Sequence, residues 1–480
     1  MYYNKSLFLS LVSGLLFFNI TYSQPDNEYY LGDIDVVENQ IKVILEIKNK
    51  QSVPEIYMYI PEQFVYAMKS DEVFFKDSDT IYARFRKISG NFSLKFNKAD
   101  NNYKGKWTQG NQNFNASFSQ VESYEVAYLQ RPQTPHEPFD YVIKEYEIEN
   151  LKAGVKLSGT LTLPKENSEK KYPLVILVTG SGPQDRNEEI AGHKPFLIIA
   201  DYLTKNGIAV FCYDDRGVGK STGNFSNSTS LDFMLDAVSI LKFFQNHPKI
   251  DKNLIGIAGH SEGGLIAIMA AAKYPKDVKF IISLAGPAVP MKELLAKQAV
   301  EIYKKEGYPA EDIILLSKMQ KELFKHALKA KDIAELRKLV TNTYNKYRDY
   351  FSEDKLSKYK INNQGINLSV VQLSGTWMRY FLSIDPTKYI KKISCPVLIL
   401  NGEKDLQVDA DLNIQAFSKL LNPNKCKIIQ IHKLSGLNHL FQNCDKCTIN
   451  EYFYIQESIS PQVLSLMKEF VFEVQKIKRK

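Results

Sequence analysis

Beyond its first residues, the sequence lacks any apolar run long enough to cross a bilayer, so we expect no stable membrane insertion. It also lacks long runs of one charge. The formal net charge is only +8 over 480 residues, and basic residues gather only at the tail, as Lys476, Lys478, Arg479 and Lys480. Such a tail is typical of a solvated terminus, so no nucleic-acid partner is expected. The hydrophobic content of 44% allows two or three globular domains.

Cysteine is scarce, with five residues in the chain. Cys212 and Cys395 lie within apolar runs and are predicted to be buried thiols, whereas Cys426, Cys444 and Cys447 lie near one another late in the chain. The C-x-x-C spacing of the last two is half of a zinc-site pattern, but no second Cys/His pair follows at ligand spacing. We therefore expect one disulfide among these three residues, and neither a metal nor another cofactor.

The one pronounced apolar run lies at the N-terminus, from about residue 7 to residue 18, after Lys5. Small and polar residues follow it as far as Ser23. This order is the pattern of a secretory signal peptide, and the run is too short for a comfortable membrane span. The sequence predicts a signal peptide over residues 1–23, cleavage before Gln24, and a secreted or periplasmic protein.

The pattern of apolar residues changes twice along the remaining sequence. Short alternating runs between turn residues predict an antiparallel β-rich domain, a small barrel or sandwich, over residues 24–130, with no titratable cluster that suggests chemistry. A Pro-rich segment at residues 131–140 is predicted to be a linker. From Tyr172, the continuous apolar runs PLVILVTG, IAVFCYD, LIGIAG and FIISLAG alternate with helical stretches. They predict an α/β domain over residues 141–480, with a mostly parallel sheet covered by helices.

A helical segment interrupts this α/β pattern at about residues 288–388. The strand signal disappears there and amphipathic helices take over, before the strand runs PVLILNG and KIIQIHKL resume. An insertion at this point is where a lid over an active site would lie, so we predict a helical lid.

The strongest chemical signal is AGHSEGG, residues 258–264, directly after one strand run and directly before a helical stretch. It satisfies G-x-S-x-G in the strand–turn–helix context that this nucleophile motif of the α/β-hydrolase fold requires. Gly259 and Gly263 supply the room that a strained turn between closely packed backbones needs. Ser261 is therefore the predicted nucleophile.

A triad on this fold follows the order Ser, acid, His, with the His in a loop after a late strand. His439, in the loop GLNHLF, has both the order and the loop. His432 lies inside a strand run, and His326 reads as a solvated position in the helical segment. For the acid we favour Asp405, a few residues after the strand run PVLILNG, and we keep Glu403 as the alternative.

The oxyanion hole needs two backbone donors. We expect one from the N–H of Glu262, at the start of the helix that follows Ser261. The second should come from Ser181 or Gly182 in the loop VTGSGPQDRNE, after the first core strand.

One segment imitates a phosphate-binding loop. DDRGVGKST, residues 214–222, contains GKST, but Asp214 stands where that motif demands its first glycine. We expect Arg216, with Asp214 or Asp215, to brace the loops around the site.

With these motifs, the chain resembles a family of exported bacterial esterases described as serine-aminopeptidase-like α/β hydrolases. The matching pieces are WTQGNQ, RPQTP, TGSGPQDRNE, YDDRGVGKSTG, GHSEGG, DPTKYIKKISCPVLILNGEKDLQV, GLNHLFQ and ESISPQVL. Ser261, Asp405 and His439 match the family's triad, and the resemblance implies esterase activity on short acyl chains. The main departure is the cysteine-containing segment NCDKCTINEY after His439.

We therefore expect a serine hydrolase that cleaves a small-molecule ester through an acyl-enzyme. Trp377, Tyr380 and Phe381 lie between the helical segment and Asp405, where they would wall an acyl pocket, or else simply pack the lid onto the core. A serine peptidase on the same fold is the first alternative, since it uses the same groups. The second is a surface-binding protein with a vestigial hydrolase core.

Overall fold

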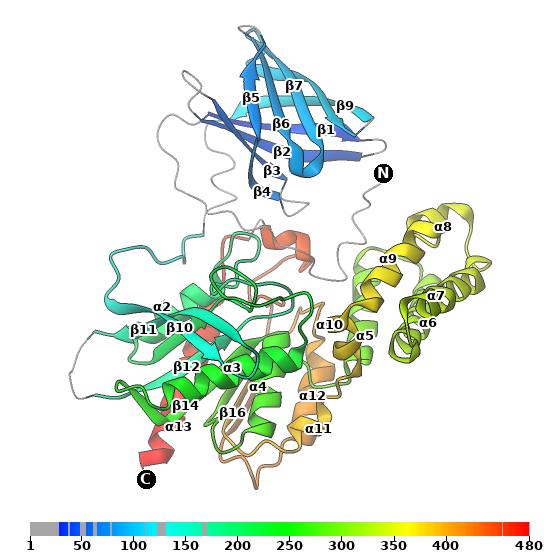
Figure 1. Cartoon of the computed structure of the whole chain (residues 1–480). Helices are drawn as coiled ribbons and strands as arrows, with labels where there is room; N and C mark the ends of the chain where they lie inside the picture. The colour runs from blue at the N-terminus through cyan, green and yellow to red at the C-terminus, as the bar shows by residue number, and fades with distance from the viewer. Residues whose placement is uncertain are drawn as a thin grey trace. The chain divides into compact units, whose positions relative to one another are not determined.

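The computed structural model describes residues 28–36, 39–48, 54–60, 65–76, 79–110, 112–121, 131–165, 170–453 and 455–479 (Figure 1). The predicted signal peptide lies outside these residues. The chain forms two compact units. Of the described residues, one unit holds those from Glu28 to Pro132 together with Asn450–Gln456, and the other holds Gln133–Ile449 and the residues from Glu457 onward.

The first unit is one antiparallel sheet of nine strands in the order β4-β3-β2-β1-β9-β8-β7-β6-β5. Because β4 and β5 stand at the two ends of this order, the described sheet is an open half-barrel and not the closed barrel or two-sheet sandwich expected from its sequence (Figure 1). The strands are β1 (Glu28–Val36), β2 (Asn39–Lys48), β3 (Glu55–Ile60), β4 (Val65–Lys69), β5 (Glu72–Phe75), β6 (Thr80–Phe85), β7 (Gly90–Asn97), β8 (Asn102–Gln109) and β9 (Gln112–Val121), with the 3-10 helix η2 (Arg86–Ile88) before β7.

Alternation along the strands places aromatic side chains on one face of this sheet. In β7, Phe92 and Leu94 are buried while Ser93 and Lys95 are exposed. Phe92 packs against Trp107 with their ring centroids 4.5 Å apart. The strand pattern read from the sequence therefore describes a half-buried sheet with its own aromatic core.

The second unit is built on an eight-stranded mixed sheet in the order β10-β11-β13-β12-β14-β15-β16-β17. β11 pairs antiparallel with both of its neighbours, and all the pairs from β13 to β17 are parallel. The strands are β10 (Tyr141–Asn150), β11 (Val155–Pro164), β12 (Tyr172–Val178), β13 (Ala209–Tyr213), β14 (Ile250–His260), β15 (Ile281–Leu284), β16 (Val397–Gly402) and β17 (Ile429–Leu434). Every residue of β12, β13, β15 and β16 is buried, as their continuous apolar runs predict.

Helices cover both faces of this sheet (Figure 1). One apolar cluster includes buried residues of α2 (Pro195–Lys205) and α13 (Pro461–Arg479), among them Phe196 and Phe470. The other cluster includes residues of α3 (Ser230–Phe244), α4 (Glu262–Lys273) and α12 (Ala410–Leu420), among them Leu241, Leu265 and Phe417. The sheet therefore lies between two apolar layers, which is the architecture predicted from alternating strands and helices.

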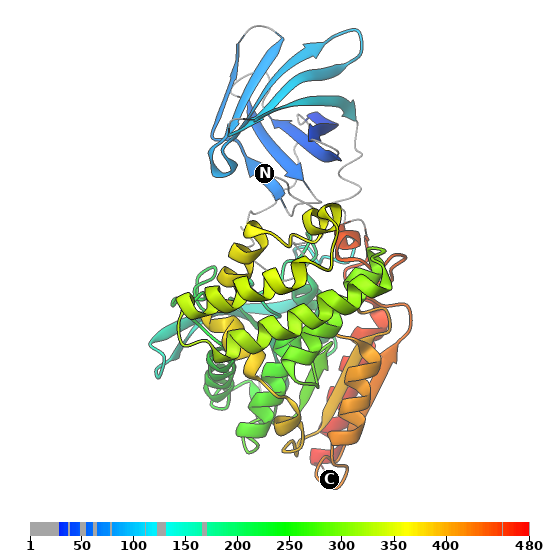
Figure 2. The ribbon, with the colours of Figure 1, turned by 90° about the vertical axis from the view of Figure 1, so that its right-hand side faces the viewer.

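Seven helices are inserted between β15 and β16 of the described chain. They are α5 (Met291–Lys305), α6 (Ala310–Lys329), α7 (Ile333–Arg348), α8 (Glu353–Lys358), α9 (Asn363–Ser374), α10 (Thr376–Ser383) and α11 (Thr387–Ile390). The inserted helices lie beside one another (Figure 2). Most of them pack around an apolar cluster of their own, in which Leu323, Val340 and Val370 are buried. None of the described helices combines the length and the apolar character that a membrane span requires.

Candidate active site

The turn between β14 and α4 holds Ser261 in a strained backbone conformation. β14 ends at His260 and α4 begins at Glu262, so Ser261 is the single residue between strand and helix. Its φ of 53° and ψ of −116° are unusual for a residue with a side chain. Its N–H donates to the Leu284 carbonyl oxygen at 2.8 Å. This is the strand–turn–helix context that the motif predicts, at the carboxyl end of the parallel strands.

The glycines on either side of Ser261 are required by close backbone packing. A Cβ on Gly259 would lie 2.0 Å from the carbonyl oxygen of Gly263. A Cβ on Gly263 would lie 2.0 Å from the carbonyl oxygen of Val178, in β12. Since both distances are far shorter than a van der Waals contact, no side chain fits at either position.

His439 and Asp405 form a buried pair at the same edge of the sheet. Nδ1 of His439 lies 2.7 Å from Oδ2 of Asp405, and the two residues are 3% and 5% exposed. The second oxygen of Asp405 accepts the backbone N–H groups of Gln407 at 2.8 Å and Val408 at 2.9 Å. A carboxylate held in this way fixes the imidazole with Nδ1 protonated, which leaves Nε2 as the nitrogen that can accept a proton.

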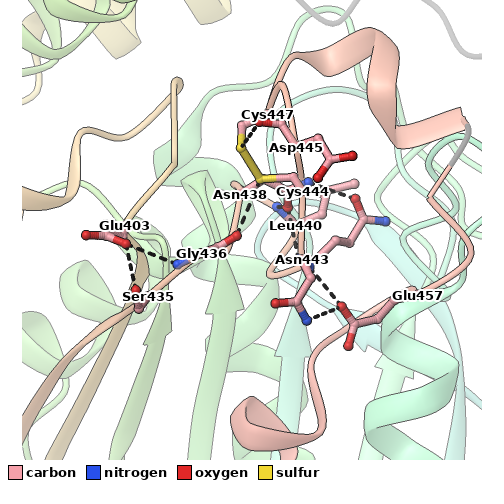
Figure 3. The surroundings of a disulfide bond; sticks show 11 residues. Glu403, Ser435, Gly436, Asn438, Leu440, Asn443, Cys444, Asp445, Cys447 and Glu457 are labelled. Carbon is pink, nitrogen blue, oxygen red and sulfur yellow. Dashed lines mark hydrogen bonds between the residues drawn. A yellow bond between two sulfur atoms is a disulfide. The ribbon is translucent and has the colours of Figure 1, made fainter.

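Glu403, the alternative acid, has a different environment. It is exposed, and its Oε2 accepts the hydroxyl of Ser435 at 2.8 Å and the N–H of Gly436 at 3.1 Å (Figure 3). These bonds lower the pKa of Glu403 and connect the two loops at the surface. Its carboxylate is therefore already engaged away from His439.

The other two histidines considered as bases lie elsewhere. His432 is inside β17, where it pairs with Leu400 of β16. His326 is in α6 and is half-buried, and its Nε2 lies 3.1 Å from the Thr343 hydroxyl. The packing of α6 against α7 thus explains His326 better than the solvated helix position expected from the sequence.

Glu262 directly follows Ser261 and accepts hydrogen bonds from three separate elements. Its Oε1 accepts from the Ser230 hydroxyl at 2.5 Å and from Trp377 Nε1 at 3.0 Å, and its Oε2 accepts from the Ser181 hydroxyl at 2.7 Å. Burial raises the pKa of Glu262, and these hydrogen bonds oppose that rise. The side chain thus connects the start of α3, the inserted helix α10 and the loop after β12.

The loop after β12 is held by two more buried carboxylates. The Gly180 N–H donates to Glu188 Oε1 at 2.6 Å. Asp215 accepts the Thr179 hydroxyl at 2.8 Å and the Gln184 N–H at 3.0 Å. Burial raises the pKa of Asp215 well above its ordinary value, in spite of these hydrogen bonds. Ser181 and Gly182, the predicted oxyanion positions, lie between these anchored residues.

His260 and Glu188 were not predicted as site residues. Nδ1 of His260 lies 3.0 Å from Glu188 Oε1, and its Nε2 lies 3.0 Å from the carbonyl oxygen of His439. His260 is 6% exposed and Glu188 is 1% exposed. The sequence signal for His260 was its position inside the G-x-S-x-G motif. That motif does not reveal a partner 72 residues away.

The aromatic residues predicted to wall an acyl pocket lie on α10. Trp377 stacks on Phe381 with ring centroids 4.9 Å apart, while its Nε1–H donates to Glu262. Phe381 is 4% exposed and belongs to the apolar core of the sheet domain, against which Tyr380 also packs. Met378, one turn away, belongs to the core of the inserted helices. α10 therefore joins the two cores, and Trp377 brings it beside the nucleophile turn.

Arg216, which we expected to brace the loops around the site, binds a different partner from the one expected. Arg216 donates from Nε and Nη2 to the two carboxylate oxygens of Asp236 in α3, at 2.6 and 2.7 Å, and not to Asp214 or Asp215. Asp214 instead accepts from Arg186, with Nη2 to Oδ2 at 2.8 Å. From the sequence we expected Arg216 to pair with an adjacent aspartate. In the structure, Arg216 and Asp214 bind partners in different elements.

A disulfide lies in the segment after His439. Cys444 and Cys447 are bonded, and Asn443 donates from its backbone N–H and from Nδ2 to Glu457 Oε2, at 2.8 and 2.7 Å (Figure 3). Cys212, Cys395 and Cys426 are buried thiols. The expected single disulfide among the last three cysteines is therefore the Cys444–Cys447 pair.

Several known proteins are similar to this chain. The family described as serine aminopeptidase, S33 matches residues 194–443, a span that contains Ser261, Asp405 and His439. Esterase EstD of Thermotoga maritima is 24% identical over 319 residues, covering 65% of this chain and 64% of EstD. Thiohydrolase aneE of Aspergillus aculeatus is 31% identical over 143 residues, covering 25% of this chain and 44% of that protein. The chain thus spans less than two thirds of either relative.

Two solved structures are also similar, with low TM-scores. Est1E of Butyrivibrio proteoclasticus with bound ferulic acid has a TM-score of 0.39 at 20% identity, covering 69% of this chain and 99% of Est1E. The hypothetical protein PA2218 of Pseudomonas aeruginosa has a TM-score of 0.43 at 18% identity, covering 72% of this chain and 97% of that protein. The family match alone spans more than half of the chain and contains the strained serine turn, and the protein therefore belongs to the serine aminopeptidase S33 family of α/β hydrolases.

Proposed function

We propose that this protein hydrolyses carboxylic esters with Ser261 as nucleophile, His439 as general base and Asp405 as the acid that orients His439. The observation that carries this proposal is the 2.7 Å contact between His439 Nδ1 and Asp405 Oδ2, at the sheet edge where Ser261 occupies its strained turn. The order Ser, Asp, His along the chain is that of α/β hydrolases.

The reaction follows from these groups. Nε2 of His439 takes the hydroxyl proton as Ser261 Oγ attacks the ester carbonyl carbon, and the resulting oxyanion is stabilised by backbone N–H groups. The C–O bond to the alcohol then breaks, and His439 returns the proton to the leaving oxygen. Water, deprotonated by the same nitrogen, attacks the acyl-enzyme, which releases the carboxylic acid and restores Ser261.

The oxyanion donors that we propose are the backbone N–H of Glu262 and that of Ser181 or Gly182. Glu262 begins α4, where the first N–H groups of a helix have no partner within the helix. The Gly180 N–H, in contrast, is taken by Glu188. The hydroxyl of Ser181 bonded to Glu262 Oε2 holds the two proposed donor segments together. One such donor is worth about 2.7–4 kcal/mol of barrier.

We propose that the inserted helices form a lid and that Trp377, Tyr380 and Phe381 limit the acyl group to short chains. Trp377 is bonded to the residue after the nucleophile and stacked on Phe381, so its indole occupies space beside Ser261. An apolar acyl group suits such a wall. Hydrolysis rates along a p-nitrophenyl ester series of increasing acyl length test this assignment, and a preference for long chains would contradict it.

A peptidase is the second candidate because of the family to which the chain belongs. An aminopeptidase needs an anionic group open to the substrate ammonium. Three buried carboxylates in the segments around the turn, Glu262, Asp215 and Glu188, already accept hydrogen bonds from side chains or backbone groups of the protein itself. This favours an ester, which needs no such anchor.

The test compares wild type and Ser261→Ala on p-nitrophenyl esters and on aminoacyl arylamides. We expect the wild type to prefer the esters by kcat/KM, and the variant to lose about 10⁴-fold or more in turnover while keeping its melting temperature. A fluorophosphonate should label Ser261 in the wild type alone. Faster turnover of arylamides would favour the peptidase, and labelling that persists in Ser261→Ala would refute the nucleophile.

A further inference from the structure

His260, the residue before the proposed nucleophile, contacts two acceptors. Its Nδ1 lies 3.0 Å from a carboxylate oxygen of Glu188, and its Nε2 lies 3.0 Å from the backbone carbonyl oxygen of His439. An ionised carboxylate and a carbonyl have no hydrogen to donate, so both of these oxygens can only accept. Both ring nitrogens must therefore donate, and an imidazole donates from both only when it is protonated.

Glu188 supplies the opposite charge. Its Oε1 accepts from His260 and also from the Gly180 N–H, at 2.6 Å. Glu188 itself is 1% exposed. An isolated charge at this depth would be costly, whereas a cation and an anion in contact compensate each other. The two residues thus form a buried ion pair that no sequence motif predicts.

The pair reaches two loops at once. Through Glu188 it holds Gly180, next to the proposed oxyanion residue Ser181, and through His260 it holds the backbone of His439. His260 is itself the residue before Ser261. One ion pair therefore connects the three segments whose mutual placement the proposed reaction requires.

The charged and titratable groups around His260 come from every neighbouring segment. Glu188 lies at Nδ1, and the charge of Asp405 also acts on the ring. The His439 ring lies with its centroid 4.7 Å from that of His260. The charge of Glu188 also acts on Asp215, together with that of Glu262.

These surroundings favour the protonated ring. Burial lowers the pKa of His260, but the charge of Glu188, its hydrogen bond, the His439 carbonyl and Asp405 together raise that pKa above the ordinary value. For a group whose folded-state pKa is raised, the stabilisation is complete below the unfolded-state pKa. It is lost as the pH rises through the folded-state pKa.

We propose that the protonated His260–Glu188 pair is a positioning unit that aligns the His439 loop and the oxyanion loop with Ser261, and that it fails when His260 loses its proton. This inference rests on the proposed triad. Deprotonated His260 sets a lone pair against an acceptor at one of its two contacts, so one of the two loops loses its anchor. Activity should therefore fall on the alkaline side, as His260 loses its proton.

The test uses Glu188→Gln, with Glu189→Gln as the matched control. A glutamine oxygen can accept from both Gly180 and His260, so the variant keeps the acceptor and removes the charge. Glu189, next in the chain, contacts Lys194 at 3.6 Å and has no part in the proposed unit. The measurement is the pH profile of kcat and KM on a p-nitrophenyl ester for wild type and both variants.

We expect Glu188→Gln to move the alkaline limb of kcat/KM downward by about one to three pH units, because an opposite charge at contact distance shifts a pKa by that much. At pH 8 we expect kcat to fall about 10- to 100-fold and KM to change less than about twofold, the mark of lost alignment. Glu189→Gln should retain the wild-type profile. An alkaline limb at the wild-type position in Glu188→Gln would overturn the inference.

A measurement without catalysis keeps the inference separate from the proposed function. In ¹⁵N NMR of histidine-labelled wild type, the His260 ring, assigned by its absence in His260→Gln, should still be protonated at a pH where free histidine, measured beside it, is mostly neutral. A neutral ring there would refute the pair even if Glu188→Gln fails to fold. If the wild type neither turns over esters nor reacts with a fluorophosphonate, the proposed function fails, whatever the ring signal shows.

Discussion

At the scale of single residues, the two acidic side chains after β16 differ in their partners. Asp405 is buried and bonded to His439, whereas Glu403 is exposed and bonded to Ser435 and Gly436. Both carboxylates follow the same strand and lie two positions apart, so the sequence kept both as candidates for the acid. The sequence favours Asp405, and the three-dimensional contacts separate the two environments, because Asp405 is buried beside His439 and Glu403 is exposed.

This difference predicts the ranking of two conservative substitutions. Asp405→Asn removes the charge that fixes the His439 tautomer, and we expect kcat on an ester to fall about 10⁴-fold. Glu403→Gln replaces an exposed carboxylate, and its kcat should stay within about twofold of the wild type. Steady-state turnover of both variants on one p-nitrophenyl ester makes the comparison. The reverse ranking would transfer the acid role to Glu403.

Sequence order could suggest Ser261, Asp405 and His439 as a triad because each lies within a few residues of the end of a strand run, where parallel strands bring their carboxyl ends together. It could not single out His260 or Glu188 as partners. Their contact depends on the path of a loop that carries Glu188 back toward the nucleophile turn, 72 residues away along the chain. Neither residue stands in a spacing pattern that signals an ion pair.

At the scale of helices and strands, α10 connects the inserted helices to the turn that holds Ser261. The Nε1–H of Trp377 reaches Glu262, and its ring stacks on Phe381. The sequence showed aromatic residues at this place but left open whether they line a pocket or pack the insertion onto the core. The structure shows the packing role for Phe381, which is buried in the core, and a polar anchor in Trp377 that hydrophobicity alone does not reveal.

Trp377→Phe should separate these contributions, because phenylalanine keeps an aromatic ring and lacks the N–H donor. A hydrogen bond to a charged group contributes about 1.5–3 kcal/mol, so we expect the free energy of unfolding to fall by about that amount. Urea unfolding of wild type and variant measures the difference. Tyr350→Phe, on the exposed surface of the insertion at 62% exposure, is the control and should change stability by less than about 0.5 kcal/mol. Equal stability of Trp377→Phe and wild type would show that the bond is not formed.

The elements of the sheet domain could be predicted wherever the strands are continuous apolar runs, as in β12, β13, β15 and β16. Their neighbours in the sheet could not. β13 lies between β11 and β12, so the order of strands in the sheet differs from their order in the chain. The hydrophobic pattern does not indicate the order in the sheet. The first unit shows the same limit, since alternation gives its strands but not the open sheet that they form.

At the scale of the whole molecule, the cysteines and the predicted signal peptide give a joint test. We expect the exported protein to begin at Gln24 and to carry one disulfide, Cys444–Cys447, with Cys212, Cys395 and Cys426 as thiols. Intact mass gives the first residue. Thiol titration in denaturant should count three reactive groups without a reductant and five with one. Five thiols before reduction would contradict the disulfide, and an intact Met1 in the exported protein would contradict the cleavage.

The carboxyl group of Glu262 would couple proton binding to any movement of α10 away from the turn that holds Ser261. While Ser230, Trp377 and Ser181 surround it, burial holds its pKa above the ordinary value. If α10 moved away from the turn, water would reach the carboxyl group and its pKa would fall toward that of an exposed glutamate. Opening would then release a proton at a pH between these two values. Acidic solution would therefore favour the contact between α10 and this turn.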